Sequence, residues 1–195
     1  MVACDELELI EGFLDAEDCG RFLDYFLHRH EWPDNRYAFA GRQFVLPRLQ
    51  TWHADAGIRY SYSNNLLVTR PWTDTLSAIR RKVENRLAYR FNSVLVNHYR
   101  NGDDFVGWHA DNEPELGESP LIASLSLGAV RPLAFQRKSN MEAGQLLLPS
   151  GSLLLMRPPF QSHWQHSVPR DQRIGTARIN LTFRNVCRAL AAPVQ

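Results

Sequence analysis

Residues 178–184 have the sequence Arg-Ile-Asn-Leu-Thr-Phe-Arg, a strict alternation of polar and apolar side chains. Successive side chains of a β-strand point to opposite faces, so this segment predicts a strand with one polar and one apolar face. Such a strand fits two environments. It can lie half-exposed with its polar face in water, or it can line the wet interior of a barrel whose outer, apolar face is covered by helices.

The polar face of this strand carries Arg178, Asn180, Thr182 and Arg184. Guanidinium groups form charge-assisted and often bidentate bonds with carboxylates, so two arginines on one face can each hold one end of a dicarboxylate such as 2-oxoglutarate. Asn97 and Tyr99 share a face of a second predicted strand and supply an amide and a phenol. Both strands therefore offer polar groups to one interior site.

Short apolar runs separated by glycine and proline dominate the chain after Phe91. They predict strands at residues 93–99, 121–127, 133–136, 144–148, 152–156, 164–168 and 178–183. Before them, residues 6–13 predict a short strand, and two helices follow, one capped by Asp15 and one at about 73–88. We expect hairpins or loops over residues 32–71. The pattern predicts an α+β, mainly β protein, a sandwich or jelly roll with the helices on one outer face.

His109 and Asp111 are separated by one residue, so on an extended backbone both side chains point to the same face. Two histidines and one carboxylate on one face of a metal, with positions open for cosubstrate and oxygen, are typical of non-haem iron(II) oxygenases. The same ligands also bind zinc. A histidine and an aspartate alone also fit an ordinary surface or hydrogen-bonded pair.

The third ligand must come from another strand, and the segment 163–166, His-Trp-Gln-His, offers two histidines. If this segment is extended, His163 and His166 point to opposite faces because they are three residues apart. We predict that His166 binds the metal and that His163 points away from it.

Charge is distributed unevenly along the chain. Residues 1–35 hold ten acidic and two basic side chains, and the remainder holds eleven acidic and twenty basic. A polyanionic partner is compatible with this basic body, although charge alone indicates no site. The odd number of cysteines and the lack of an apolar span or signal-like start favour an unexported cytoplasmic protein without a membrane partner. We expect a monomer.

Four motifs resemble the AlkB family of nucleic-acid demethylases, which are iron(II) and 2-oxoglutarate dependent dioxygenases. They are Asn-His-Tyr-Arg-Asn-Gly at 97–102, Gly-Trp-His-Ala-Asp-Asn-Glu at 107–113, His-Trp-Gln-His-Ser at 163–167 and Arg-Ile-Asn-Leu-Thr-Phe-Arg at 178–184. The resemblance covers about residues 39–185, and it is nearest to the DNA-repair branch. The final motif, at its distance from the His-x-Asp pair, is the most specific part.

The resemblance implies a double-stranded β-helix, with one domain over residues 1–195. Residues 1–90 would supply the N-terminal helices and a nucleotide-recognition hairpin or lid, and residues 91–188 the catalytic core. It implies iron(II) ligands His109, Asp111 and His166. It further implies 2-oxoglutarate contacts from Asn97, Tyr99, Arg178, Asn180 and Arg184.

For the substrate, the resemblance implies N-methylated bases such as 1-methyladenine or 3-methylcytosine in DNA. These bases are cationic, which favours a pocket with an aromatic face and a carboxylate. Tyr62 would stack on the base, Tyr60 and Glu113 would approach its edge, and Arg48 would contact the nucleotide or its pocket. Two alternatives stay open: the same chemistry on RNA or protein, and a non-enzymatic nucleic-acid-binding jelly roll. Solvent exposure of Arg178 and Arg184 would favour the latter.

Overall fold

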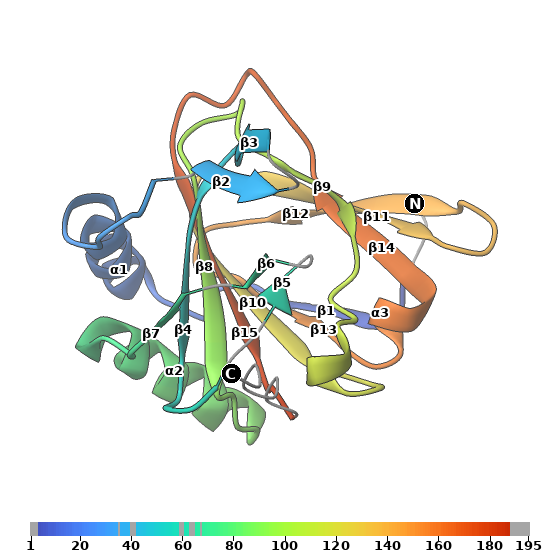
Figure 1. Ribbon diagram of the computed structural model, residues 1–195, viewed down its shortest axis with the longest axis horizontal. Helices are drawn as coiled ribbons and strands as arrows, with labels where there is room; N and C mark the ends of the chain where they lie inside the picture. Colours follow the sequence, from blue (N-terminus) through green and yellow to red (C-terminus); the bar gives the residue numbers. More distant parts are fainter. Residues whose placement is uncertain are drawn as a thin grey trace.

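Two β-sheets that face each other form the body of the protein, and two helices cover the outer face of the larger sheet (Figure 1). The computed structural model describes residues 4–34, 36–39, 42–58, 61–62, 65–66 and 68–187. The larger sheet has the strand order β1 (Leu7–Ile10), β13 (Leu153–Met156), β10 (Ile122–Gly128), β15 (Arg178–Arg184), β8 (Ser93–Tyr99), β4 (Leu49–Ala54) and β7 (Thr69–Arg70).

The smaller sheet has the order β12 (Ala143–Leu148), β11 (Arg131–Arg137), β14 (Trp164–Val168) and β9 (Val106–His109). Two separate hairpins pair β2 (Arg36–Phe39) with β3 (Arg42–Val45) and β5 (Ser61–Tyr62) with β6 (Asn65–Leu66). Strand pairing within the two sheets is antiparallel except between β4 and β7. Two facing antiparallel sheets confirm the predicted double-stranded β-helix, or jelly roll.

Both predicted helices are present, and side-chain caps fix where each begins. In α1 (Ala16–His28), the backbone N–H of Asp18 donates to Asp15 Oδ1 at 2.8 Å. In α2 (Asp74–Leu87), the backbone N–H of Leu76 donates to Thr73 Oγ1 at 3.2 Å. These bonds satisfy N–H groups that lack a partner inside the first turn.

The apolar face of β15 packs beneath the helices, as the alternation predicts. Ile179, Leu181 and Phe183 are fully buried in one cluster with Phe22 and Phe26 of α1 and with Leu76, Ile79 and Val83 of α2. The polar face of β15 therefore points inward, between the two sheets. This packing fixes the orientation of the strand, because a slip of one residue would exchange its two faces.

Strand β4 corrects the expectation of only hairpins or loops over residues 32–71. It pairs along its whole length with β8, from Leu49 opposite His98 to Ala54 opposite Ser93. The strand gives no clear alternation because its polar Thr51 and His53 are buried. Thr51 Oγ1 lies 2.8 Å from His30 Nε2, and His53 Nδ1 donates to the carbonyl of Pro71 at 2.7 Å.

The first strand is shorter than predicted, since β1 covers only 7–10 and Gly12 turns the chain with a φ of 62°. Within the described ranges, no helix is long and apolar enough to cross a membrane. The division into residues 1–90 and 91–188, the cytoplasmic location and the monomeric state stay predictions.

Candidate active site

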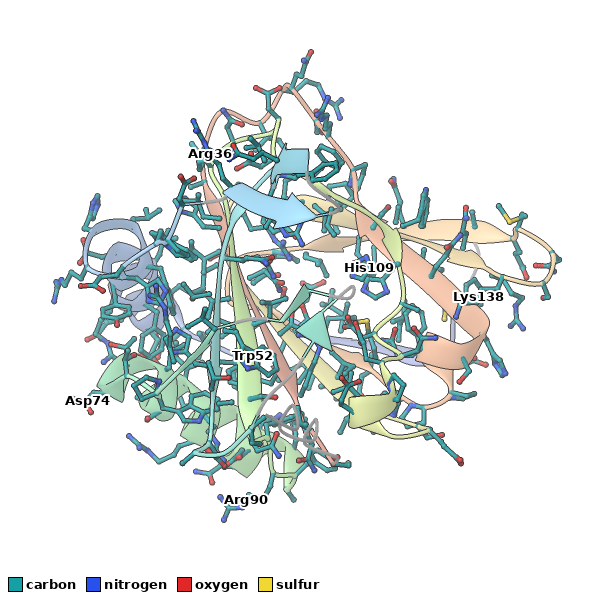
Figure 2. All side chains as sticks on the ribbon, viewed as in Figure 1. Arg36, Trp52, Asp74, Arg90, His109 and Lys138 are labelled. Carbon is teal, nitrogen blue, oxygen red and sulfur yellow. The ribbon has the colours of Figure 1, made fainter. Side chains whose placement is uncertain are left out.

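The three predicted metal ligands come together between the sheets. His109 ends β9 and lies directly opposite His166 of β14 in the antiparallel pair, with 4.3 Å between the ring centroids. The chain leaves the strand after His109, and Asp111 follows with its Oδ1 4.0 Å from His109 Nε2. In the view of Figure 2, His109 lies on the side of the larger sheet that faces away from α1 and α2.

Asp111 is almost fully buried, and two neighbours hold it in place. Arg184 Nη2 donates to Asp111 Oδ1 at 2.8 Å, and the backbone N–H of Asp111 donates to Gln161 Oε1 at 2.8 Å. Burial alone would raise the pKa of Asp111, but the charge of Arg184 and the neighbouring imidazoles outweigh it and lower the pKa to about 2. Asp111 is therefore an ionised carboxylate at neutral pH.

Both imidazoles are neutral, as metal ligands must be. Burial, together with the nearby His109, lowers the pKa of His166 to about 3, and burial also lowers the pKa of His109. The Nδ1 atom of His109 lies 2.9 Å from the carbonyl oxygen of Gly107. A carbonyl only accepts hydrogen bonds, so Nδ1 carries the proton and Nε2 presents its lone pair towards Asp111.

Two imidazoles and a carboxylate fit a divalent transition metal, although His109 and Asp111 are too far apart in this structure to bind one ion together. Two ligand atoms that are each about 2.1 Å from an ion at a right angle lie about 3 Å apart. The 4.0 Å between His109 Nε2 and Asp111 Oδ1 exceeds this. Accordingly, no three metal-binding side chains among the described residues form a complete site.

Arg178 lies at the other end of the polar face of β15 and is 1% exposed. Its Nη2 donates to Ser126 Oγ at 2.9 Å, and its guanidinium carbon lies 5.3 Å from the centre of the Tyr99 ring. Its Nε and Nη1 have no partner of good geometry in the described part of the chain. Burial lowers the pKa of Arg178 to about 10. Among the described residues Arg178 bonds to the neutral groups Ser126 and Tyr99, and a buried cation without a carboxylate partner fits an anionic ligand.

Amide and hydroxyl side chains lie between Arg178 and Arg184 in the site. Asn180 Nδ2 donates to Ser124 Oγ at 2.7 Å, and Asn180 Oδ1 accepts from Thr182 Oγ1 at 3.0 Å. Asn97 Oδ1 accepts from Arg48 Nε at 2.9 Å. This network fixes the floor of the site before any ligand binds.

One cavity between the sheets brings these groups together. It is lined by Arg48, Leu95, Asn97, Tyr99, Val106, His109, Asp111, Ser124, Leu133, Met156, His166, Val168, Arg178, Asn180, Thr182 and Arg184. All residues predicted to bind metal or cosubstrate are among them. The candidate metal ligands and the buried arginines therefore line the same cavity, so a metal ion and an anionic ligand could bind next to each other there.

Comparison with known proteins agrees with this arrangement. A model of the 2OG-Fe(II) oxygenase superfamily matches residues 6–184. The chain belongs to this superfamily. Among solved structures, that of OsALKBH1 resembles this oxygenase with a TM-score of 0.67 and 16% sequence identity, and the match covers 95% of this chain and 100% of that one. At this identity the likeness concerns the fold.

Two curated relatives confirm the resemblance to AlkB proteins. Mouse DNA oxidative demethylase ALKBH2 is 40% identical over 154 residues, which cover 75% of this oxygenase and 64% of the mouse protein. Human alpha-ketoglutarate-dependent dioxygenase alkB homolog 3 is 34% identical over 188 residues, which cover 91% of this chain and 65% of the human protein. This oxygenase thus spans slightly less than two thirds of the length of these relatives.

Of the four residues predicted to bind the base, only Arg48 is among the described residues that line the cavity. Arg48 is buried in the cavity, whereas Glu113 is half-buried before the short helix η1 (Pro114–Leu116) and is not among the described residues that line it. Tyr62 belongs to the hairpin strand β5, where its backbone pairs with Asn65. Tyr60 lies outside the described residues.

His163 corrects the expectation that residues 163–166 form one extended segment. It ends the short helix α3 (Phe160–His163), and β14 begins at the next residue. Its side chain is half-exposed, and its Nδ1 lies 3.8 Å from a carboxylate oxygen of Glu6. His163 therefore points away from the cavity, as predicted, but because a helix and not a strand carries it.

Three site residues were missed from the sequence. Ser124 and Ser126 alternate with apolar residues along β10, a period-two pattern that could have placed them on the inner face. Gln161 offers no such signal, because it lies in a four-residue helix and reaches the backbone of Asp111, fifty positions earlier in the chain.

Proposed function

We propose that this oxygenase uses iron(II), 2-oxoglutarate and oxygen to demethylate N-alkylated bases in DNA. The observation that carries the proposal is the shared cavity, in which two neutral imidazoles and an ionised carboxylate lie next to buried, cationic arginines. In this proposal the iron ligands are His109, Asp111 and His166. The cosubstrate contacts come from Asn97, Tyr99, Arg178, Asn180 and Arg184.

The two arginines of β15 have different tasks in this proposal. Arg184 stands at the metal end, where its bond to Asp111 keeps that carboxylate ionised and oriented. Arg178 receives the carboxylate at the other end of 2-oxoglutarate, with its guanidinium held by Ser126 and lying against Tyr99. A dicarboxylate would thus offset a buried charge that has no carboxylate partner among the described residues.

The bound iron would supply one chemical step, the oxygen-dependent hydroxylation of the N-methyl group, coupled to conversion of 2-oxoglutarate into succinate and carbon dioxide. The hydroxymethyl group then leaves the base as formaldehyde. The protein contributes a site whose amides and hydroxyls are already bonded to each other. The alternative of a non-enzymatic nucleic-acid-binding protein expects Arg178 and Arg184 to be exposed to solvent. They are 1% and 2% exposed, which disfavours that alternative.

DNA as the substrate is supported by the name of the mouse relative and by the resemblance of the sequence motifs. A cationic methylated base needs an aromatic wall and a nearby negative charge. We assign the wall to Tyr62 and the base edge to Tyr60 and Glu113, with Arg48 at the nucleotide or its pocket. The base must leave its stack for the methyl group to reach the metal, at a cost of a few kcal/mol in a duplex.

A panel of methylated substrates tests this function. DNA and RNA oligonucleotides with 1-methyladenine or 3-methylcytosine and a methylated peptide would be compared for formaldehyde and succinate release, with Asp111→Ala as the inactive control. We expect equimolar formaldehyde and succinate from methylated DNA. Release from RNA or peptide alone would move the activity to that substrate, and release from no member of the panel would refute demethylation.

A further inference from the structure

A second buried guanidinium lies behind the cosubstrate end of the cavity. Arg131 begins β11 and is 0% exposed. Alternate residues of this strand point inward, so Arg131 shares a face with Leu133, which lines the cavity. Arg131 itself does not line the cavity.

Arg131 binds only neutral groups among the described residues. Its Nη1 donates to the carbonyl of Asn101 at 3.0 Å, and its Nη2 donates to those of Asp104 at 2.9 Å and Pro169 at 2.7 Å. The nearest carboxylates already have other partners. Asp104 pairs with Arg100 and Asp171 pairs with Arg173, each at 2.7 Å. The charge of Arg131 therefore has no dedicated counter-ion in the described part of the chain.

Tyr99 lies against both buried cations. The guanidinium carbon of Arg131 is 5.6 Å from the centre of the Tyr99 ring, and that of Arg178 is 5.3 Å from it. Both distances are within cation–π range. Burial lowers the pKa of both arginines, and the charge of Arg131 contributes to the low pKa of Arg178. Two positive charges therefore lie against Tyr99 at the end of the cavity where the proposed dicarboxylate ends, with Arg178 lining the cavity and Arg131 behind it.

Arg131 also connects the two loops that adjoin the proposed cosubstrate residues Tyr99 and Arg178. One loop, residues 100–105, follows Tyr99, and the other, residues 169–177, precedes Arg178. The two loops bond to each other at Gly102, whose N–H donates to Ile174 at 2.7 Å and whose carbonyl accepts from Asp171 at 2.9 Å. A Cβ atom at Gly102 would overlap the carbonyl of Asp171, so the loops approach as closely as glycine allows.

We propose that Arg131 is a positioning residue for the cosubstrate. It holds Tyr99 and the loop ends in place, and it adds a fixed positive charge behind Arg178 that favours a dicarboxylate. This inference rests on the proposed function, because it assumes that 2-oxoglutarate binds next to Arg178.

The test compares Arg131→Met and Arg131→Lys with Arg137→Met, which changes an arginine at the far end of the same strand. Binding of 2-oxoglutarate is measured without oxygen, with manganese(II) in place of iron, alongside the KM for 2-oxoglutarate and kcat at saturation. We expect Arg131→Met to raise the Kd and KM roughly 3- to 30-fold, the range for a residue that acts through others. Its kcat and metal affinity should stay within about twofold of the parent.

Arg131→Lys keeps the charge but loses the planar fork that reaches three carbonyls, so its KM should lie between those of the parent and Arg131→Met. If Arg131→Met does not fold, Arg131→Lys still decides, because a parental KM in it would overturn the inference. An equal loss of kcat and metal affinity in Arg131→Met would also overturn it. Absence of 2-oxoglutarate binding in the parent protein would instead refute the proposed function.

Discussion

Replacing Arg178 by methionine should move cosubstrate affinity and stability in opposite directions. Methionine keeps an unbranched side chain of similar reach but removes the charge and all five donors. The parent Arg178 is 1% exposed, donates to Ser126 Oγ at 2.9 Å and also interacts with Tyr99 through a side-chain hydrogen bond and its ring. At a pKa of about 10 it remains protonated at neutral pH.

The size of the effect follows from these contacts. A hydrogen bond to a charged group contributes about 1.5–3 kcal/mol, so losing the contact with a carboxylate should weaken 2-oxoglutarate binding roughly 10- to 100-fold. Without ligand, the same change removes a buried charge that has no carboxylate partner among the described residues, and desolvating such a charge is costly. We therefore expect a higher Kd and an unchanged or higher free energy of unfolding.

Calorimetric titration with 2-oxoglutarate and urea unfolding of the ligand-free protein measure the two quantities. Arg178→Lys is the matched variant, because it keeps the charge and loses only the fork, so its Kd should lie between the other two. A parental Kd in Arg178→Met would remove Arg178 from the cosubstrate site. A fall of several kcal/mol in its stability would show that the arginine is structural.

Three further outcomes are expected. Gln161→Ala should weaken iron(II) binding about 10- to 100-fold by freeing the backbone of Asp111, and a parental affinity would contradict this role. Burial and neighbouring positive charge lower the pKa of His30 to about 4, so the unfolded chain binds more protons below about pH 6.5 and stability falls as the pH drops towards 4. The free energy of unfolding, measured with urea, falls on acidification to about pH 5, and His30→Gln should make this fall smaller by about 2 kcal/mol. Replacement of the exposed His28 by Gln should leave the fall unchanged. Tyr62→Ala should slow demethylation of 1-methyladenine but leave 2-oxoglutarate binding intact, and a parental rate would move the base slot elsewhere.

Prediction from sequence succeeded best at residues 178–184. The alternation predicts one apolar and one polar face, and of the two environments that it allowed the structure has the interior one, because the helices cover the apolar face. The same reasoning placed His109 and Asp111 together, although the strand ends at His109 and Asp111 lies beyond it.

Several of the failures come from polar groups that are buried against distant partners. Thr51 and His53 hide the periodicity of β4, because their partners lie at His30 and Pro71. Gln161 and Arg131 act through backbone atoms of distant segments, and backbone atoms leave no trace in side-chain patterns. Such residues can be found only once the fold brings the segments together.

The most direct test of the central claim is the visible absorption of an iron(II)–2-oxoglutarate chelate, recorded without oxygen. We predict that the band appears in the parent protein, persists in His163→Ala and is lost in His166→Ala, because only His166 faces Asp111 and His109 across the cavity. A parent protein that gives no band, or a His166→Ala variant that keeps it, would contradict the account.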